Sequence, residues 1–240
     1  MALPNLLNAK LTKIVDITPS VRELYLKPMG PNTFEFKAGQ FVMLHIPDPA
    51  NPGKLAQRAY SVASSDLVKS EYRLVIKYYD LGLASGWVKT LKGGEEITFT
   101  GPFGKFLFRE PPAEQVIHVA TSTGLAPLYS MLTSKCMNMT NVDFKIFMGV
   151  WNESEIFYAK ELEEVKKKLP RLEINFVLDK PNSPDWRGMK GFVTEYIAKC
   201  NLERPTEFYI CGNPAMIKSV KEMLTAKNFP KQKIYTESYG

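Results

Sequence analysis

The hydrophobic pattern of this 240-residue chain changes its period at the sequence EPP, residues 110–112. Before this point, short segments of alternating apolar and polar residues are separated by prolines and glycines, as in an antiparallel barrel or sandwich. After it, strand-like segments alternate with segments of helical spacing, which is typical of a parallel, doubly wound sheet. We therefore predict two domains, residues 1–112 and 113–240.

The expected elements follow from these two patterns. In the first half we expect strands at residues 10–17, 21–28, 40–47, 57–64, 72–79 and 95–101, with a short helix at 84–91. In the second half we expect strands at residues 115–120, 144–150, 172–178, 207–211 and 233–238, with a helix in each of the four gaps. The chain is thus predicted to pair an antiparallel β-barrel with an α/β doubly wound, parallel, five-stranded sheet.

Composition and charge argue against several classes of function. The net charge of +6 comes without a basic block, so we expect no nucleic acid partner. Cys136, Cys200 and Cys211 are far apart, which predicts no metal site, no iron–sulfur cluster and no disulfide framework. We find no apolar run of membrane-spanning length and no signal peptide at the start, so we predict a cytoplasmic protein without membrane insertion. A hydrolase is not supported either, because the G-x-S-x-G motif does not occur.

The stretch QRAYS, residues 57–61, places three polar or aromatic side chains in an expected strand. Alternation sends Arg58 and Tyr60 to one face of the sheet, and Ser61 follows directly. A guanidinium binds phosphate, a phenol ring offers a flat surface and a hydroxyl forms hydrogen bonds, which together suit a ligand with a phosphorylated tail and an aromatic head. An edge strand with a snorkelling arginine explains the same residues equally well.

Two loops that follow expected strands are rich in small residues. In TSTGLAP, residues 121–127, Gly124 lets the backbone approach a ligand, and Pro127 is predicted to open a helix. In CGNPAM, residues 211–216, a cysteine and a glycine follow the strand, and Pro214 lies near a helix start. Because the carboxyl ends of parallel strands converge, both loops are expected to flank one crevice that favours a pyrophosphate. An ordinary turn and a small buried cysteine are the simpler interpretations.

The motifs RAYS, GLAS (82–85), STGLAP, CGNPAM and ESYG (237–240) occur in this order along the chain. Together they resemble the ferredoxin–NADP reductase-like superfamily over essentially the whole chain. Its members are flavoproteins with an N-terminal flavin-binding barrel and a C-terminal nicotinamide-nucleotide domain. The resemblance implies FAD as cofactor, with FMN less favoured, and NADH or NADPH as substrate.

The resemblance also implies a role for individual residues. Arg58 would bind the flavin phosphate, Tyr60 would pack on the isoalloxazine ring, and Ser61 would hydrogen-bond near its reactive nitrogen. The implied flavin site comprises Arg58, Ala59, Tyr60, Ser61, Val75, Ile76, Lys77, Gly82, Leu83, Ala84 and Ser85. Ser85 is expected to begin a helix whose amides face the pyrophosphate, or else to serve as an ordinary helix N-cap.

The implied nicotinamide-nucleotide site comprises Thr123, Gly124, Pro127, Cys211, Gly212, Pro214, Met216 and Tyr239. The implied catalytic residues are Ser61, Cys211, Glu237 and Tyr239, the last two lying at the second face of the flavin. The chain departs from the family in one respect, since it has Ser122, Thr123 and Gly124 where the family often has G-T-G.

The choice between NADH and NADPH depends on the ends of the second and third strands of the second half, GVWNESE and LDKPNSPDWRG. Glu153 and Asp179 would repel a 2′-phosphate, whereas Lys180 and Arg187 would hold it. The pattern LDKP…WRG…GFV resembles the branches that use NADH. We therefore favour NADH.

The resemblance implies hydride transfer from the nicotinamide to the flavin, followed by electron transfer to an acceptor. No general base is needed, and His45 and His118 are expected to be packing residues. Because the chain has no iron–sulfur motif, we expect a separate acceptor protein, such as a ferredoxin, a flavodoxin or an oxygenase component, and a monomer or weak oligomer. Two alternatives remain: a free-flavin reductase, and a nucleotide-binding electron-transfer subunit or redox sensor of a larger complex.

Overall fold

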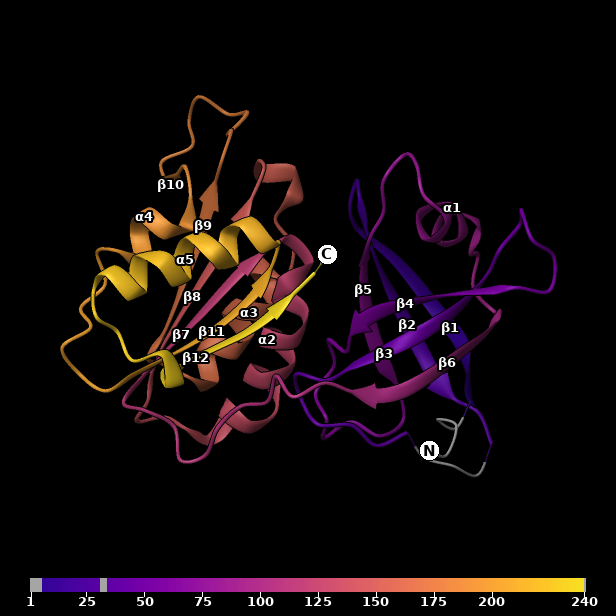
Figure 1. Cartoon of the computed structure of the whole chain (residues 1–240), viewed down its shortest axis with the longest axis horizontal. Coiled ribbons are helices and arrows are strands. Elements are labelled where there is room, and N and C mark those ends of the chain that lie inside the picture. Colours follow the sequence, from indigo (N-terminus) through magenta and orange to yellow (C-terminus); the bar gives the residue numbers. More distant parts are fainter. Residues whose placement is uncertain (1–5, 31–33, 240) are drawn as a thin grey trace.

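The computed structural model describes residues 6–30 and 34–239. Residues 1–5 and Gly240, which we assigned to the two domains, lie outside the described residues. The chain folds into two domains that lie side by side, each built on one six-stranded sheet (Figure 1). The predicted pairing of an antiparallel barrel with a parallel α/β domain is confirmed, whereas the residues at which one domain ends and the other begins stay a prediction.

The first domain is an antiparallel sheet with the strand order β4-β3-β6-β1-β2-β5. Its strands are β1 (Leu6–Thr18), β2 (Val21–Pro28), β3 (Phe41–Pro47), β4 (Leu55–Ser61), β5 (Tyr72–Lys77) and β6 (Glu96–Phe103), and α1 (Leu83–Thr90) precedes β6. The side chains of Val42, Leu44 and Ile46 are fully buried, every second residue along β3, because successive residues of a strand point to opposite faces. An isolated bridge between Val62 and Leu74 joins the two edges of the sheet just beyond the end of β4.

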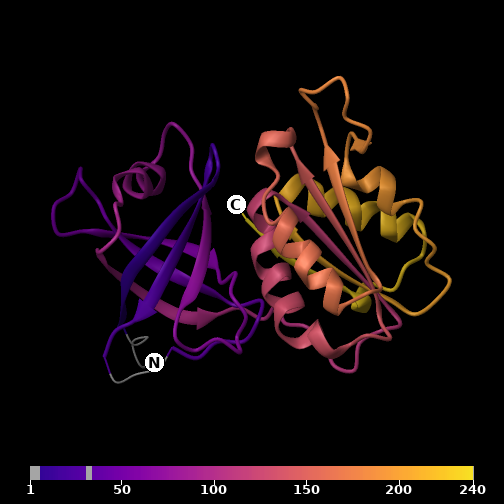
Figure 2. The ribbon, with the colours of Figure 1, turned by 180° about the vertical axis from the view of Figure 1, so that it is seen from behind.

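The second domain is a parallel sheet covered on both faces (Figures 1 and 2). Its strands are β7 (Gln115–Thr121), β8 (Asp143–Val150), β9 (Leu172–Leu178), β10 (Met189–Lys190), β11 (Thr206–Gly212) and β12 (Ile234–Ser238). The helices α2 (Leu125–Thr133) and α3 (Ala159–Lys168) pack on one face, and α4 (Val193–Ile197) and α5 (Pro214–Ala226) pack on the other. Short 3-10 helices occur at η1 (Ser122–Gly124), η2 (Lys135–Asn138), η3 (Glu153–Glu155) and η4 (Lys231–Lys233).

Two details of the second domain differ from the sequence prediction. The sheet has six strands and not five, because Met189 and Lys190 pair with Val177 and Leu178 as β10. A two-residue strand is too short to show any hydrophobic period. The helix after β7 begins at Leu125, preceded by η1, so Pro127 is its third residue and does not open it. A proline is tolerated there because the first four backbone N–H groups of a helix have no partner within the helix.

The strand order β10-β9-β8-β7-β11-β12 places a topological switch point between β7 and β11. From β7 the chain adds β8, β9 and β10 on one side, and it then returns to add β11 and β12 on the other. The loops after β7 and β11 therefore leave the sheet in opposite directions and open a crevice between them.

The two domains share buried contacts. Val21 and Val75 of the barrel belong to the same hydrophobic cluster as helices α2 and α3. The buried carboxylate of Glu23 accepts hydrogen bonds from Tyr158 and from Arg73, the latter over 3.1 Å. His118 is fully buried in β7 and His45 lies in β3, in keeping with their predicted packing roles.

Candidate functional site

The predicted flavin site lies along the free edge of β4. Arg58 and Tyr60 stand opposite Leu44 and Val42 of β3, so they share one face, as the alternation predicts. The Arg58 guanidinium is exposed, donates to the carbonyl of Gln57 over 2.8 Å and makes no ion pair within the described residues. It is therefore available to an anion. Burial raises the pKa of Tyr60 to about 12, so the phenol is neutral at physiological pH.

The predicted pyrophosphate segment leads into α1. Gly82 is the N-cap of α1 and has φ +112°, a conformation that glycine adopts readily. Ser85 is the third residue of the helix, and its hydroxyl accepts a hydrogen bond from the N–H of Tyr79 over 3.0 Å. The two predictions for Ser85, that it begins the helix or caps it, are therefore wrong. Its hydroxyl instead ties the loop between β5 and α1 to the first turn of the helix.

The predicted flavin residues of β5 are only partly available to a ligand. The side chains of Val75 and Ile76 are buried, so that only their backbone can face a cofactor. Lys77 forms an ion pair with Glu155 of η3, with 2.8 Å between Nζ and Oε2. This contact ties the barrel to the second domain. Ala59, the remaining predicted residue of β4, is exposed.

The four predicted catalytic residues come together at the domain junction. Figure 1 shows the end of β12, which carries Glu237, pointing toward the barrel. The parallel register of β11 and β12 places Cys211 beside Glu237. Ser61 of β4 donates a hydrogen bond to Oε1 of Glu237 over 2.8 Å. The hydroxyl of Tyr239 donates to the Ser61 oxygen over 2.7 Å, and its backbone N–H donates to the carbonyl of Gly212. We call Ser61, Cys211, Glu237 and Tyr239 the junction cluster.

Burial disfavours negative charge on the titratable side chains of the junction cluster. It raises the pKa of Glu237 to about 7, against the opposing effect of the hydrogen bond from Ser61. Burial also raises the pKa of the Cys211 thiol and of the Tyr239 phenol well above their ordinary values. Cys211 is thus a thiol and not a thiolate at neutral pH, and Glu237 is the member that can exchange a proton near pH 7.

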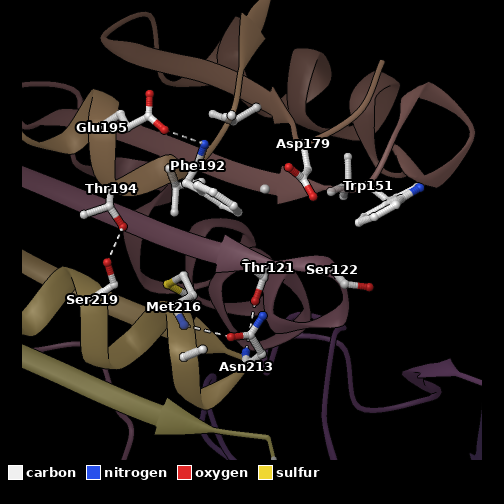
Figure 3. Close-up of a pocket in the computed structure, with 16 residues that line it drawn as sticks. Thr121, Ser122, Trp151, Asp179, Phe192, Thr194, Glu195, Asn213, Met216 and Ser219 are labelled. Atoms are coloured by element: carbon white, nitrogen blue, oxygen red, sulfur yellow. Dashed lines mark hydrogen bonds between the residues drawn. The ribbon is translucent and has the colours of Figure 1, made fainter. Parts of the chain in front are cut away.

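A cavity of about 630 Å³ lies at the carboxyl ends of β7, β8, β9 and β11 (Figure 3). It is lined by Thr121, Ser122, Gly149, Val150, Trp151, Val177, Asp179, Gly191, Phe192, Val193, Thr194, Glu195, Asn213, Ala215, Met216 and Ser219. The loops after β7 and β11 thus flank one crevice, as the sequence predicts. A hydrogen bond of 3.0 Å from the N–H of Asn213 to Oγ1 of Thr121 joins them.

The predicted nucleotide residues are distributed around this crevice. Met216 lines the cavity, and Pro214 is the first residue of α5. Glycine is required twice where the loops meet: a Cβ on Gly124 would lie 2.2 Å from the carbonyl oxygen of Cys211, and one on Gly212 would lie 2.1 Å from Oγ1 of Thr121. Thr123 lies in η1, whereas Pro127 is buried within α2.

Several cavity residues were missed by the sequence predictions. Thr121, Trp151, Phe192 and Asn213 line the cavity but were not among the predicted site residues. Of the two aromatic residues, Trp151 had a weak signal in the sequence, because it directly follows an expected buried strand. Phe192 had none, and only the structure shows that its side chain is 63% exposed. Ser122 takes the left-handed conformation with φ +48°, at the position where the family often has glycine, and its buried hydroxyl has no hydrogen-bond partner among the described residues.

The charged residues considered for nucleotide choice occupy different places. Asp179 lines the cavity. Glu153 does not, because its carboxylate accepts the backbone N–H groups of Asn182 and Ser183 over 2.8 and 3.0 Å. The ammonium group of Lys180 lies 4.5 Å from the centre of the Trp151 ring. Arg187 is exposed and donates to the carbonyl of Pro184.

Comparison with known proteins assigns a class to each domain. Residues 8–108 match the model of the oxidoreductase FAD-binding domain, and residues 119–222 match that of the oxidoreductase NAD-binding domain. The chain is 30% identical to ferredoxin–NADP reductase B of Sorangium cellulosum, over 96% of each chain. The chain belongs to the ferredoxin–NADP reductase-like family of flavoprotein oxidoreductases.

Two further matches extend this comparison. The glycine betaine monooxygenase reductase subunit of Chromohalobacter salexigens is 28% identical over 97% of the chain, and the chain spans 64% of that relative's length. The fold matches that of a ferredoxin NADP⁺ reductase from Neisseria gonorrhoeae, with a TM-score of 0.84, 21% identity and coverage of 97% of this chain and 98% of that one.

No helix among residues 6–30 and 34–239 is long and apolar enough to cross a membrane.

Proposed function

We propose that this protein is an FAD-dependent NADH oxidoreductase that passes electrons to a separate carrier protein. The junction cluster carries the proposal, because Ser61 of the FAD-binding domain is hydrogen-bonded to Glu237 and Tyr239 of the NAD-binding domain. A reaction between two bound cofactors requires such a meeting point. Gly212 links the cluster to the nucleotide cavity, since it lies between Cys211 and the cavity residue Asn213.

The residues along β4 and α1 fit an FAD. Arg58 offers a phosphate a guanidinium that makes no ion pair with a described residue, the N-terminal amides of α1 lie after Gly82, and Tyr60 offers a neutral aromatic ring. FAD bound there would accept a hydride and release electrons singly. The protein would orient the two rings and exclude water, while Glu237 would hold or release a proton at its carboxyl group.

The cavity supports NADH as the preferred nucleotide. Asp179 lines it and would accept hydrogen bonds from ribose hydroxyls, but would repel a 2′-phosphate. The lining residues, all of them described, include no lysine or arginine. The ammonium group of Lys180 lies over the Trp151 ring, and the side chain of Arg187 turns back to its own loop.

A separate acceptor protein is supported by the relatives, which include reductase subunits and components of monooxygenases. The mildly basic barrel, with 14 lysines and arginines against 10 acidic residues up to Pro112, would favour an acidic acceptor. We also propose a cytoplasmic location, which the three free cysteines support.

The test is an anaerobic visible absorption spectrum of the purified protein, titrated with NADH and, separately, with NADPH. We expect a flavin spectrum that NADH bleaches at lower concentration than NADPH. A protein without flavin that oxidises NADH only when free flavin is added would replace the proposal by the free-flavin reductase. Bleaching by NADPH at the lower concentration would refute the role given to Asp179.

A further inference from the structure

We propose that the side-chain amide of Asn213 donates a hydrogen bond to a phosphate oxygen of the bound nicotinamide nucleotide. This inference rests on the proposed function and adds a residue to its nucleotide site. Asn213 is exposed and lines the cavity, between the end of β11 and the start of α5.

The orientation of the Asn213 side chain is fixed by its role as the N-cap of α5. The backbone N–H of Met216 meets the side chain over 2.8 Å. Because an N–H group is a donor, the atom it meets must be the oxygen, so the amide nitrogen points the other way. Figure 3 shows this nitrogen on the side of Thr121, toward the cavity. This nitrogen donates no hydrogen bond to any described residue, so its two N–H groups are available to a ligand.

The position of Asn213 along the sheet indicates which part of the nucleotide it meets. Asp179 follows β9 at one end of the crevice, and Cys211 of the junction cluster is the next-to-last residue of β11. A dinucleotide that stretches from one to the other has its central phosphates at the switch point, between β7 and β11. Asn213 lies there, at the N-terminus of the 13-residue helix α5, where the helix dipole also favours an anion.

The variant that tests this is Asn213→Asp. An aspartate keeps the oxygen that caps α5, so the fold is retained, but it replaces the donor with a negative charge. Asn201→Asp is a matched control, because Asn201 also accepts a backbone N–H through its side-chain oxygen, from Glu203 over 2.9 Å. Asn201 lies before β11, near the amino ends of the strands, whereas the cavity lies at their carboxyl ends. The flavin-loaded proteins are titrated with NAD⁺, ADP-ribose and the phosphate-free probe adenosine.

We expect Asn213→Asp to weaken the binding of NAD⁺ and of ADP-ribose at least about tenfold, because this is the affinity that the loss of a hydrogen bond to a charged group removes. Adenosine binding and the melting temperature should stay unchanged, and Asn201→Asp should bind all three ligands as the wild type does. Unchanged ADP-ribose affinity in Asn213→Asp would overturn the inference and leave the proposed function in place. An equal loss of adenosine would overturn the assignment to a phosphate. A wild-type protein that binds neither NAD⁺ nor ADP-ribose would instead refute the proposed function.

Discussion

The stability of the flavin-free protein should depend on pH through Glu237. Burial raises the pKa of this carboxyl from 4.5 to about 7. Between these two values the folded protein binds more protons than the unfolded chain, so stability falls as pH rises through this window. A pKa difference of about 2.5 corresponds to about 3 kcal/mol of unfolding free energy.

The assay is urea denaturation of the wild type and of Glu237→Gln at intervals from pH 4 to pH 8. Glutamine keeps an oxygen that accepts the Ser61 hydrogen bond but does not ionise, so all other titrating groups cancel in the difference between the two proteins. Cys211 and Tyr239 do not interfere, because burial raises the pKa of each well above its ordinary value. We expect the wild type to lose about 3 kcal/mol relative to the variant between pH 4.5 and 7. If the unfolding free energies of the wild type and the variant changed equally with pH across this window, the argument that burial raises the pKa of Glu237 would be refuted.

Three further changes test other parts of the structure. Arg58→Ala should weaken FAD binding at least tenfold, by loss of a charge-assisted contact to phosphate, and unchanged flavin content after dialysis would remove Arg58 from the site. Tyr158→Phe should lower the unfolding free energy by about 1–3 kcal/mol, because buried Glu23 loses a donor, and an unchanged urea midpoint would contradict this. Ser122→Gly should raise the unfolding free energy by about 1 kcal/mol, because glycine adopts the left-handed backbone without strain and removes a buried hydroxyl that has no partner among the described residues. Asn228→Gly, at φ +55°, is the control for the backbone effect alone. If both variants gain equally, the Ser122 hydroxyl contributes nothing.

Local patterns in the sequence predicted most of the fold. Alternation along β3 and helical spacing in α5 are properties of short segments, and both elements form where expected. Contacts between distant residues left no such pattern: Tyr158 and Glu23 are 135 positions apart, and nothing near either residue indicates the other. Ser85 shows a similar limit. Serine is a common N-cap residue, but here the loop before α1 brings the N–H of Tyr79 to its hydroxyl.

The candidate site was predictable to the extent that topology determines it. Because parallel strands end at the same edge of a sheet, the sequence predicted that the loops after β7 and β11 flank one crevice. The junction cluster came instead from the family resemblance: β12 pairs with β11 and places Glu237 beside Cys211, 26 positions away in the sequence, and the catalytic role of the cluster stays a prediction. The side chains lining the cavity follow a different logic, because Trp151, Phe192 and Asn213 are placed by loop conformations after the strands. Asn213 illustrates the point: asparagine is a common helix N-cap, but the direction of its amide nitrogen follows only from the N–H of Met216 in α5, which fixes the position of the oxygen.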